Sequence, residues 1–259
     1  RSKRQLQDSR PEILPCEPLF GDDEAALTVA TLTFNERRMA QLQYYGVHGK
    51  NVAIASRTVP PASGTREQAI DDIMNIMWDE GYEASSVKAI SEKLGITRSS
   101  FYNAFGSREE LFKEVLMHYA EQSPDYALAL ATPPIDVKLL FTLVFREACA
   151  ARASDKDGRG CLGINSVTEL CNRDEKLTPL LEELILGNIK RIETILTWGV
   201  ESKELPRSLD THGTALSLKA LLVGLNVMCK AVREEEELWL AAKTTLSALD
   251  MFEEPPANS

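Results

Sequence analysis

The sequence predicts an all-α fold. From Thr65 onward, apolar residues recur at spacings of three and four, which is the period of a helix with one buried face. The alternation typical of a half-buried strand is nearly absent from this part of the chain. Residues that cap helices, such as Ser and Thr, stand before these runs, and Gly or Pro often follows them. A chain built only from helices explains all three observations.

The first 64 residues have a different character. Proline is frequent there, apolar and acidic residues mix without a sustained period, and the run Val59–Gly64 has the composition of a linker. We expect residues 1–64 to be an irregular or disordered leader, and an upstream extension of the true protein is an equally good interpretation.

Four helices are predicted between Thr65 and Tyr119. Their N-caps and stops are, in order, Thr65 and Gly81, Ser86 and Gly95, Thr97, and Ser107. Glu109 and Glu110 suit the positive N-terminal end of the fourth helix.

Further helices are predicted up to the C-terminal end. Their ranges are 136–153, 161–171, 178–200, 211–231 and 234–251. Thr178 and Pro179 are a cap followed by proline at the first helical position, and Asp210 or Thr211 opens the next helix. We expect two domains after the leader, a small one over 65–112 and a larger helical one over 113–259.

Composition excludes several classes of protein. The chain has 259 residues, of which 44% are hydrophobic and 26% are charged, a normal globular balance. No run of about 18 apolar residues exists, so we expect no transmembrane helix and no membrane partner. The cysteines are most simply interpreted as the reduced thiols of a cytoplasmic protein. The five cysteines are widely spaced without a CxxC pair, and the three histidines lie far apart, so we expect neither a disulfide scaffold nor a metal site, and no cofactor.

The second and third helices form a helix-turn-helix pattern. Ile90, Leu94, Ile96 and Phe101 are spaced to share a small core, and Gly95 can adopt the left-handed conformation of a tight turn. The third helix would enter the major groove of DNA with its N-terminal residues facing the bases. The face that it exposes is Thr97, Arg98, Ser99, Ser100 and Asn103, and no acid follows until Glu109. An ordinary helical hairpin with a glycine turn is the alternative.

This region resembles the DNA-binding domain of the TetR family of transcriptional regulators. The residues that carry the resemblance are Gly81–Val87, Ile90, Leu94–Thr97 and Ser100–Leu111. The match extends from Thr65 to Leu111, and the later helices resemble the family's ligand-binding and dimerisation domain in layout. Gly160–Gly163 resembles a segment of one subgroup.

The resemblance implies a role for each matching residue. Ser86 would hold a phosphate, Thr97, Arg98, Ser99 and Ser100 would face bases or phosphates, and Tyr102 would contact the DNA backbone. Arg108 stands where the family usually has a phosphate-binding lysine, and Asn103 completes the exposed face. Ala104 departs from the pattern, because the family often has histidine there, which removes one phosphate contact.

The resemblance also implies partners. These are a palindromic operator in double-stranded DNA, a second copy of the chain, and a small-molecule effector of unknown identity. Helices 211–231 and 234–251 are the candidates for a dimer bundle, through stripes formed by Ala215, Leu218, Leu222, Leu225, Leu238, Ala241 and Leu249. Burial of these stripes within one chain is the alternative.

The effector would lie among the helices of the larger domain. Candidate lining residues are Met117, Phe141, Phe145, Leu184 and Trp198, each of which is also an ordinary core residue. Cys161 follows Gly160 at a predicted helix start, where the helix dipole favours a thiolate. The subgroup resemblance implies that this thiol senses electrophiles or oxidants, and a small buried residue is the alternative.

We therefore predict a ligand-responsive DNA-binding regulator, a repressor released from its operator by a small molecule or by thiol modification. An enzyme is not expected, because no phosphate-binding loop, HExxH or GxSxG pattern occurs. A helical protein-interaction regulator that has lost specific DNA binding is the alternative, which Ala104 and the net charge of −4 over residues 65–112 keep open.

Overall fold

The computed structural model describes residues 65–255, and this part of the chain is helical without strands, which confirms the all-α prediction. The predicted leader, residues 1–64, and residues 256–259 lie outside the described part. The helices are α2 (Arg66–Ala84), α3 (Val87–Leu94), α4 (Arg98–Phe105), α5 (Arg108–Gln122), α6 (Tyr126–Leu130), α7 (Val137–Ser154), α8 (Leu162–Leu170), α9 (Thr178–Glu201), α10 (Thr211–Met228) and α11 (Glu235–Ala248).

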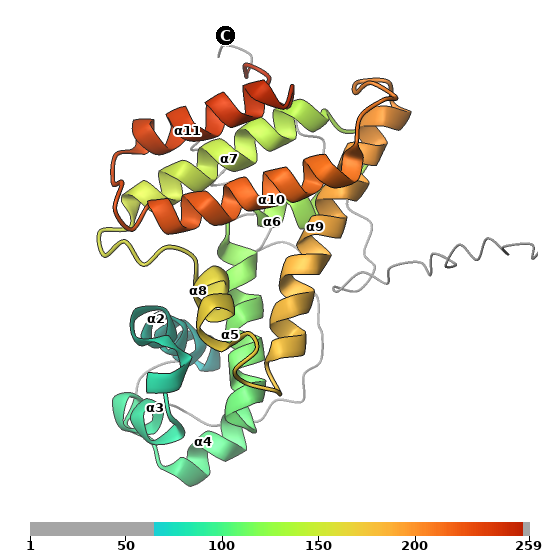
Figure 1. Cartoon of the computed structure of the whole chain (residues 1–259). Coiled ribbons are helices and arrows are strands. Elements are labelled where there is room, and N and C mark those ends of the chain that lie inside the picture. Colours follow the sequence, from blue (N-terminus) through green and yellow to red (C-terminus); the bar gives the residue numbers. More distant parts are fainter. Residues whose placement is uncertain (1–64, 256–259) are drawn as a thin grey trace, which may run out of the picture.

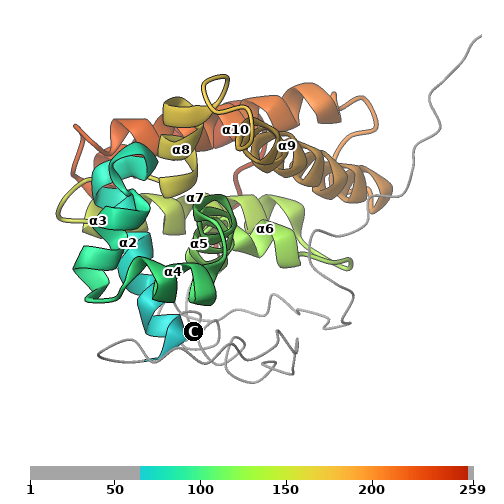
Figure 2. The same ribbon diagram turned by 90° about the horizontal axis from the view of Figure 1, so that it is seen from below.

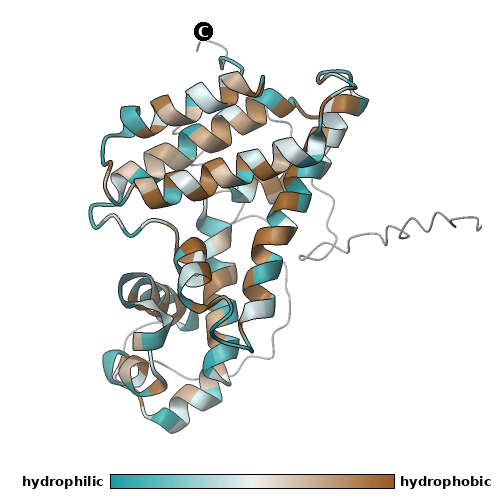
Figure 3. Ribbon diagram, viewed as in Figure 1, coloured by the Kyte–Doolittle hydropathy of each residue, from teal (hydrophilic) through white to brown (hydrophobic). Residues whose placement is uncertain are grey.

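The helices form two apolar cores, and α9 contributes to both. The lower core joins α2, α3, α4 and α5 with α8 and the start of α9. The upper core joins α6, α7, α10 and α11 with the rest of α9. Figure 1 shows α7, α10 and α11 lying across the top of the molecule, while α5 and α9 run from the lower to the upper part. Apolar stripes follow α7, α9 and α10 in Figure 3.

The predicted domain boundary at residue 112 falls inside a continuous helix. Phe112 and Val115 of α5 are both fully buried in the lower core. Leu162 and Leu170 of α8, which the prediction assigns to the larger domain, are buried in that same core. The first helices of the chain therefore share their apolar interior with α8.

Local signals place most helix ends where they were predicted. Thr65, Ser86 and Thr97 each accept a hydrogen bond from a backbone N–H in the first turn. Ser107 and Glu110 form a reciprocal capping box at the start of α5. Helical periodicity and N-caps depend on residues close together in the chain, so helix ends can be predicted from the sequence alone.

Three details differ from the prediction. The first helix bends at Gly81, where φ is +82°, and continues to Ala84 instead of ending. Helix α9 has Leu177 at its N-cap, and the Thr178 hydroxyl donates to the Asp174 carbonyl oxygen at 2.7 Å. The short helix α6 has no counterpart among the predicted elements.

The predicted dimerisation stripes are largely internal. Ala215, Leu218, Leu222, Leu225 and Leu238 are all buried in the upper core of a single chain. These five residues therefore fit the alternative interpretation, in which the stripes are buried within one chain. A different face of α10 and α11 is exposed, and it is described below. Within residues 65–255, no helix combines the length and the apolar character that crossing a membrane requires.

Candidate nucleic-acid interface

Helices α3 and α4 form the predicted helix-turn-helix. The α3 helix ends at Gly95, which adopts the left-handed conformation with φ +65° and ψ +31°. A side chain at this position would meet no atom within 4 Å, so the backbone conformation alone explains the glycine. Ile90 and Phe101 are fully buried between the two helices and the rest of the lower core. This packing holds α4 at the outer end of the molecule, as Figure 2 shows from below.

Four of the predicted contact residues lie on the exposed surface of α4. Arg98, Ser99 and Asn103 are exposed, and 53% of Tyr102 is accessible to solvent. Within residues 65–255 their polar side-chain groups make no hydrogen bond or ion pair. The ring of Tyr102 packs edge-on against Phe101, with 5.6 Å between ring centroids. A core residue thus orients Tyr102 while leaving its hydroxyl group in solvent.

Of three other predicted contact residues, Ser86 and Thr97 cap helices, and Ser100 bonds to Thr97. The Ser86 hydroxyl accepts from Ala89 N at 3.1 Å. The Thr97 hydroxyl accepts from Ser100 N at 3.1 Å and lies 2.9 Å from the Ser100 hydroxyl. Ser86 and Thr97 mark the two helix N-termini at the interface, where backbone N–H groups favour an anion. Their contacts to DNA remain predictions.

The eighth predicted residue, Arg108, is engaged within the protein. Its Nε donates to the Ser85 carbonyl oxygen at 3.0 Å, and its Nη2 donates to the carbonyl oxygens of Tyr82 and Glu83. The guanidinium lies 3.8 Å from the centroid of the Tyr82 ring. Burial raises the pKa of Tyr82 to about 12, and the charge of Arg108 opposes this rise. Arg108 therefore joins α5 to the segment between α2 and α3, and its phosphate contact remains a prediction.

The helix-turn-helix is tied to α8 at the Gly81 bend. The Glu169 carboxylate, near the end of α8, accepts from Tyr82 N at 3.1 Å and from Glu83 N at 2.8 Å. These N–H groups have no intrahelical partner because the helix is interrupted at Gly81. An ion pair joins Arg66, at the start of α2, to Glu114 of α5. Movement of α8 would thus act directly on the segment that leads into α3.

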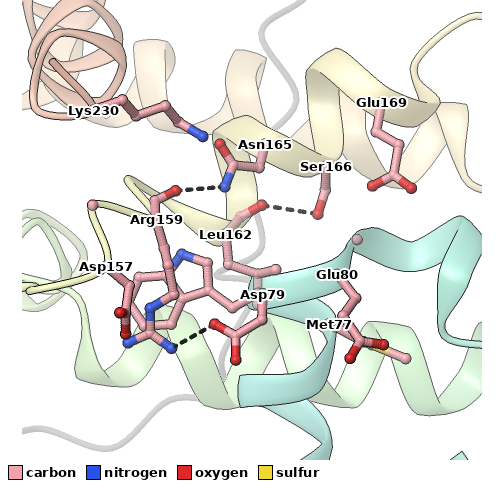
Figure 4. A pocket seen from close by; sticks show the side chains of 13 residues that line it. Met77, Asp79, Glu80, Asp157, Arg159, Leu162, Asn165, Ser166, Glu169 and Lys230 are labelled. Carbon is pink, nitrogen blue, oxygen red and sulfur yellow. Dashed lines mark hydrogen bonds and ion pairs between the residues drawn. The ribbon is translucent and has the colours of Figure 1, made fainter.

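A polar cleft of about 440 Å³ separates α2 from α8 and the loop before it (Figure 4). Arg159 lies 4.0 Å from the centroid of the Trp78 ring and donates to Asp79 and Asn75. Its Nε also pairs with Asp155 at 3.2 Å. The indole Nε1 of Trp78 is buried without a hydrogen-bond partner in the described part of the chain. Arg159 therefore forms a second connection between α2 and the loop that precedes α8.

The six predicted effector residues lie in different surroundings. Phe141 and Phe145 are fully buried in the upper core, whereas 41% of Met117 is exposed. Trp198 packs on the upper core beneath the guanidinium of Arg191, and Leu184 is partly buried beside Gly163. None of the six lines the cleft of Figure 4. The binding roles of these residues remain predictions.

Cys161 occupies the N-cap of α8, as predicted, and is partly buried against the lower core. Burial raises the pKa of Tyr119 of α5, and the nearby Cys161 thiol raises it further. Cys149 is fully buried, and its pKa rises to about 12 because the thiolate would be desolvated. Cys149, Cys161, Cys171 and Cys229 all carry free thiols.

Sequence reasoning missed two buried basic residues, Arg152 of α7 and Lys219 of α10. A lone basic residue in an amphipathic helix gives no local sign that it will be buried. An acidic group formed by Asp136, Glu204 and Glu253 was also missed. The Glu204 carboxylate accepts from Val137 N and Lys138 N, and it therefore caps α7. Burial raises the pKa of Glu204.

Family models match two parts of the chain. Residues 69–115 match the model for bacterial regulatory proteins of the tetR family. Residues 143–245 match the model for the tetracyclin repressor-like C-terminal domain. The two matches fall on the helix-turn-helix and on the helices that follow α6.

Individual relatives, both curated proteins and solved structures, agree with these family-model matches. The chain is 24% identical over 182 residues to the HTH-type transcriptional repressor ComR of Escherichia coli, a match covering 70% of this chain and 87% of ComR. It is 28% identical to the TetR family transcriptional regulator CifR, solved as a cysteine mutant with 26-base-pair double-strand operator DNA. That similarity covers 73% of this chain and 99% of the CifR chain, with a TM-score of 0.65. The reduced form of E. coli NemR shares the fold, with 19% identity and a TM-score of 0.57. That similarity covers 74% of this chain and 98% of the NemR chain.

Proposed function

Because the chain belongs to the TetR family of bacterial regulatory proteins, we propose that it is a repressor that binds a palindromic operator as a homodimer. A small molecule, or modification of a thiol, releases it from DNA. The observation that carries the proposal is the exposed face of α4, where the polar side-chain groups of Arg98, Ser99, Tyr102 and Asn103 make no hydrogen bond or ion pair within residues 65–255. The related CifR, which was solved with operator DNA, supports it.

The four residues suit the major groove. Arg98 and Asn103 carry the donors and acceptors that recognise base edges, whereas Ser99 and Tyr102 can bond to phosphates or bases. They lie in the first two turns of α4, the part of a recognition helix that faces the bases. Ser86, Thr97 and Ser100 lie beside them, and the two helix N-termini that Ser86 and Thr97 cap would attract phosphates. The net charge of −10 makes non-specific binding weak, so specificity rests on this local surface.

A homodimer provides two copies of this surface. Half-sites of a palindrome lie about 34–36 Å apart, which one recognition helix cannot span. The described chain exposes large apolar side chains on α10 and α11, namely Leu216, Val227, Met228 and Leu240. A side chain added at Gly224 of α10 would meet nothing within 4 Å, so a partner helix could approach closely there. This exposed face supports α10 and α11 as the dimer contact.

Release from DNA is proposed to pass through α8. Cys161 stands at its first end, and Glu169, near its last end, holds the Tyr82 and Glu83 N–H groups at the Gly81 bend. A bulky or charged group on the Cys161 sulfur would displace the start of α8, because Leu162 and Gly163 beside it are buried. That displacement would change the position of α3 and α4 in each protomer, and with it the separation of the two recognition helices. Effector binding near α8 would act in the same way.

The proposal includes no catalysis, and it places the protein in the bacterial cytoplasm, where its DNA target lies. The sign of regulation depends on where the operator stands relative to the promoter, and repression agrees with the relative ComR.

A gel-shift titration of the full chain tests the proposal. The probe is DNA from the region upstream of the protein's own gene, with competitor DNA and graded salt. The proposal expects a discrete, competitor-resistant complex that contains two protomers for each palindrome. If neither this probe nor sites selected from the whole genome give such a complex, the helical interaction protein without specific DNA binding becomes the better account.

A further inference from the structure

Two basic side chains are buried where the two cores meet. Arg152 of α7 is 6% exposed, and Lys219 of α10 is 7% exposed. Long basic side chains normally keep their charged ends in water, and a buried charge is unfavourable unless a partner compensates it. The DNA interface lies at the other end of the molecule and uses neither residue. Their burial therefore points to a separate role.

The guanidinium of Arg152 is held by neutral groups. Its Nε donates to Asn226 Oδ1, and its Nη2 donates to the Tyr119 hydroxyl at 3.1 Å. Asn226 is itself oriented, because its amide nitrogen donates to the Leu222 carbonyl oxygen at 2.8 Å. Within residues 65–255 no carboxylate lies within ion-pair distance of the guanidinium. A guanidinium has five N–H groups, so Arg152 has donors left for a further acceptor.

Lys219 lies on the same face of α10 as Asn226. The two are seven residues apart, which is two helical turns, or about 10 Å along the helix axis. Across the described residues the ammonium group makes neither a hydrogen bond nor an ion pair. Burial lowers the pKa of Lys219, and the nearby Asp125 and Cys161 oppose that effect. The charge of this lysine is thus buried and uncompensated at close range.

The same neighbours affect all three polar side chains. Asp125 and Cys161 interact electrostatically with Tyr119, with Arg152 and with Lys219. Five groups from α5, α7, the start of α8, α10 and the turn before α6 therefore form one polar cluster, here called the compartment. The Asp125 carboxylate accepts a hydrogen bond from the Ser123 hydroxyl, and it supplies one negative charge against two positive ones. Among these five groups, one positive charge remains without a counter-charge.

We propose that this compartment binds the carboxylate group of a small, otherwise apolar effector, through Lys219 and the remaining N–H groups of Arg152. The inference rests on the effector-responsive function proposed above and names the chemical class of the effector. A carboxylate matches the planar geometry of a guanidinium, and its single charge balances the single excess positive charge. A phosphate monoester would carry more negative charge than the compartment offsets.

The surroundings favour an apolar body on that carboxylate. Leu222 lies between Lys219 and Asn226 on α10, and Leu162 follows Cys161 on α8. These two leucines are 3% and 2% exposed, and they belong to the upper and the lower core, respectively. An apolar chain that starts at Lys219 would therefore lie against both cores. It would also reach the start of α8, the helix that holds the Gly81 bend.

Isothermal titration calorimetry of the full chain tests this proposal. The probes are acetate, butanoate, hexanoate and octanoate at pH 7, with hexanamide as the neutral match for hexanoate. Affinity is expected to rise with chain length, and hexanamide is expected to bind at least tenfold more weakly than hexanoate. Lys219→Met should weaken hexanoate binding at least tenfold, whereas Lys219→Arg should retain the preference for the acid. Lys190→Met is the matched control, because Lys190 of α9 is exposed.

Folding of the variants can be checked separately. Methionine places an apolar chain of similar length where the ammonium is buried, so Lys219→Met should melt at the same temperature as the wild type or higher. If Lys219→Met does not fold, Lys219→Gln replaces it, with the same expected loss of hexanoate binding.

Three results would overturn the proposal: no binding of any acid in the series, equal binding of hexanoate and hexanamide, or full binding by the folded neutral variant. Operator binding is measured on the same preparations without any acid. Loss of operator binding in the wild type would contradict the proposed function and would leave the calorimetric result intact. A failed titration beside normal operator binding would contradict only the carboxylate assignment.

Discussion

Arg108 shows how one side chain can satisfy a family pattern and still have another role. Its position matches that of a phosphate-binding cation, yet its guanidinium donates to three carbonyl oxygens and covers the Tyr82 ring. Hydrogen bonds from a charged donor contribute more to stability than neutral ones. The first role of Arg108 in the folded chain is therefore to fix the segment between α2 and α3.

Substitution by lysine separates the two roles of Arg108. Lys keeps the positive charge that a phosphate needs but cannot reproduce the planar set of donors. We expect Arg108→Lys to lower the free energy of unfolding by about 1–3 kcal/mol, while operator affinity at a temperature well below melting falls by less than tenfold. Urea unfolding and fluorescence anisotropy measure the two quantities. Unchanged stability with a large loss of affinity would mean that the phosphate contact dominates.

The burial of Cys149 makes the stability of the fold depend on pH in the alkaline range. Burial raises its pKa from an ordinary value of 9.0 to about 12 in the folded chain. The folded state therefore holds this proton more tightly than the unfolded state, so the stability it contributes is complete below pH 9 and is lost as pH rises from 9 towards 12. Thermal melts between pH 8 and pH 11 should show a decline that is smaller in Cys149→Ala. Tyr82, whose pKa rises to about 12, adds to the decline in both proteins.

At the scale of elements, the turn between α3 and α4 sets the angle of the recognition helix. Gly95 has positive φ, which a β-carbon disfavours, and no neighbouring atom obstructs a larger residue. Gly95→Ala should therefore cost about 1 kcal/mol in stability through the backbone alone. Gly95→Asn should cost less, because asparagine tolerates the left-handed conformation. Chemical unfolding of the two variants measures the difference, and equal stability of Gly95→Ala and wild type would contradict this account.

The sequence predicted those features that depend on local spacing. Thr65, Ser86, Thr97 and Ser107 cap helices as expected, because capping needs only a hydroxyl within three residues of an N–H group. The bend at Gly81 was interpreted as a helix end, because Glu169, which bonds to the freed N–H groups, is 87 residues away from Tyr82. The buried positions of Arg152 and Lys219 likewise depend on contacts between distant helices.

The candidate site was predictable to a similar extent. The exposure of Arg98, Ser99, Tyr102 and Asn103 follows from the periodicity of a short helix that buries Phe101 and Phe105. The engagement of Arg108 with backbone carbonyl groups did not follow from spacing. The placement of the six predicted effector residues in different surroundings also did not follow from spacing. Helix periodicity indicates which face of a helix is buried but not in which core it is buried.

At the scale of the whole molecule, α9 contributes to both cores, and α8 packs against α2 and α5. A signal that moves α8 does not have to cross a flexible linker within residues 65–255. Glu169 connects α8 to α2, and Arg159 connects the loop before α8 to Asp79 of α2, as Figure 4 shows for Arg159. Regulation in this account is a change in the packing of helices that are already in contact.

The exposed apolar face predicts the effect of charge on assembly. Leu216 and Val227 are 45% and 51% exposed in one protomer, so Leu216→Glu with Val227→Glu should leave the protomer folded and separate the dimer. Sedimentation velocity should show a monomer, with weaker operator binding. Leu186→Glu, on the 63% exposed Leu186 of α9, is the control and should remain a dimer. A dimeric double variant would place the interface on another surface.

The most direct test of the central claim measures operator affinity of the double variant Arg98→Ala with Tyr102→Ala by fluorescence anisotropy. Both side chains are exposed on α4, so circular dichroism and sedimentation should match the wild type. The expected loss is roughly 30-fold or more, from about 1–3 kcal/mol for each of the two contacts. Arg207→Ala, an exposed arginine in the loop before α10, should bind normally. Wild-type affinity in the double variant would contradict the claim that this face of α4 binds the operator.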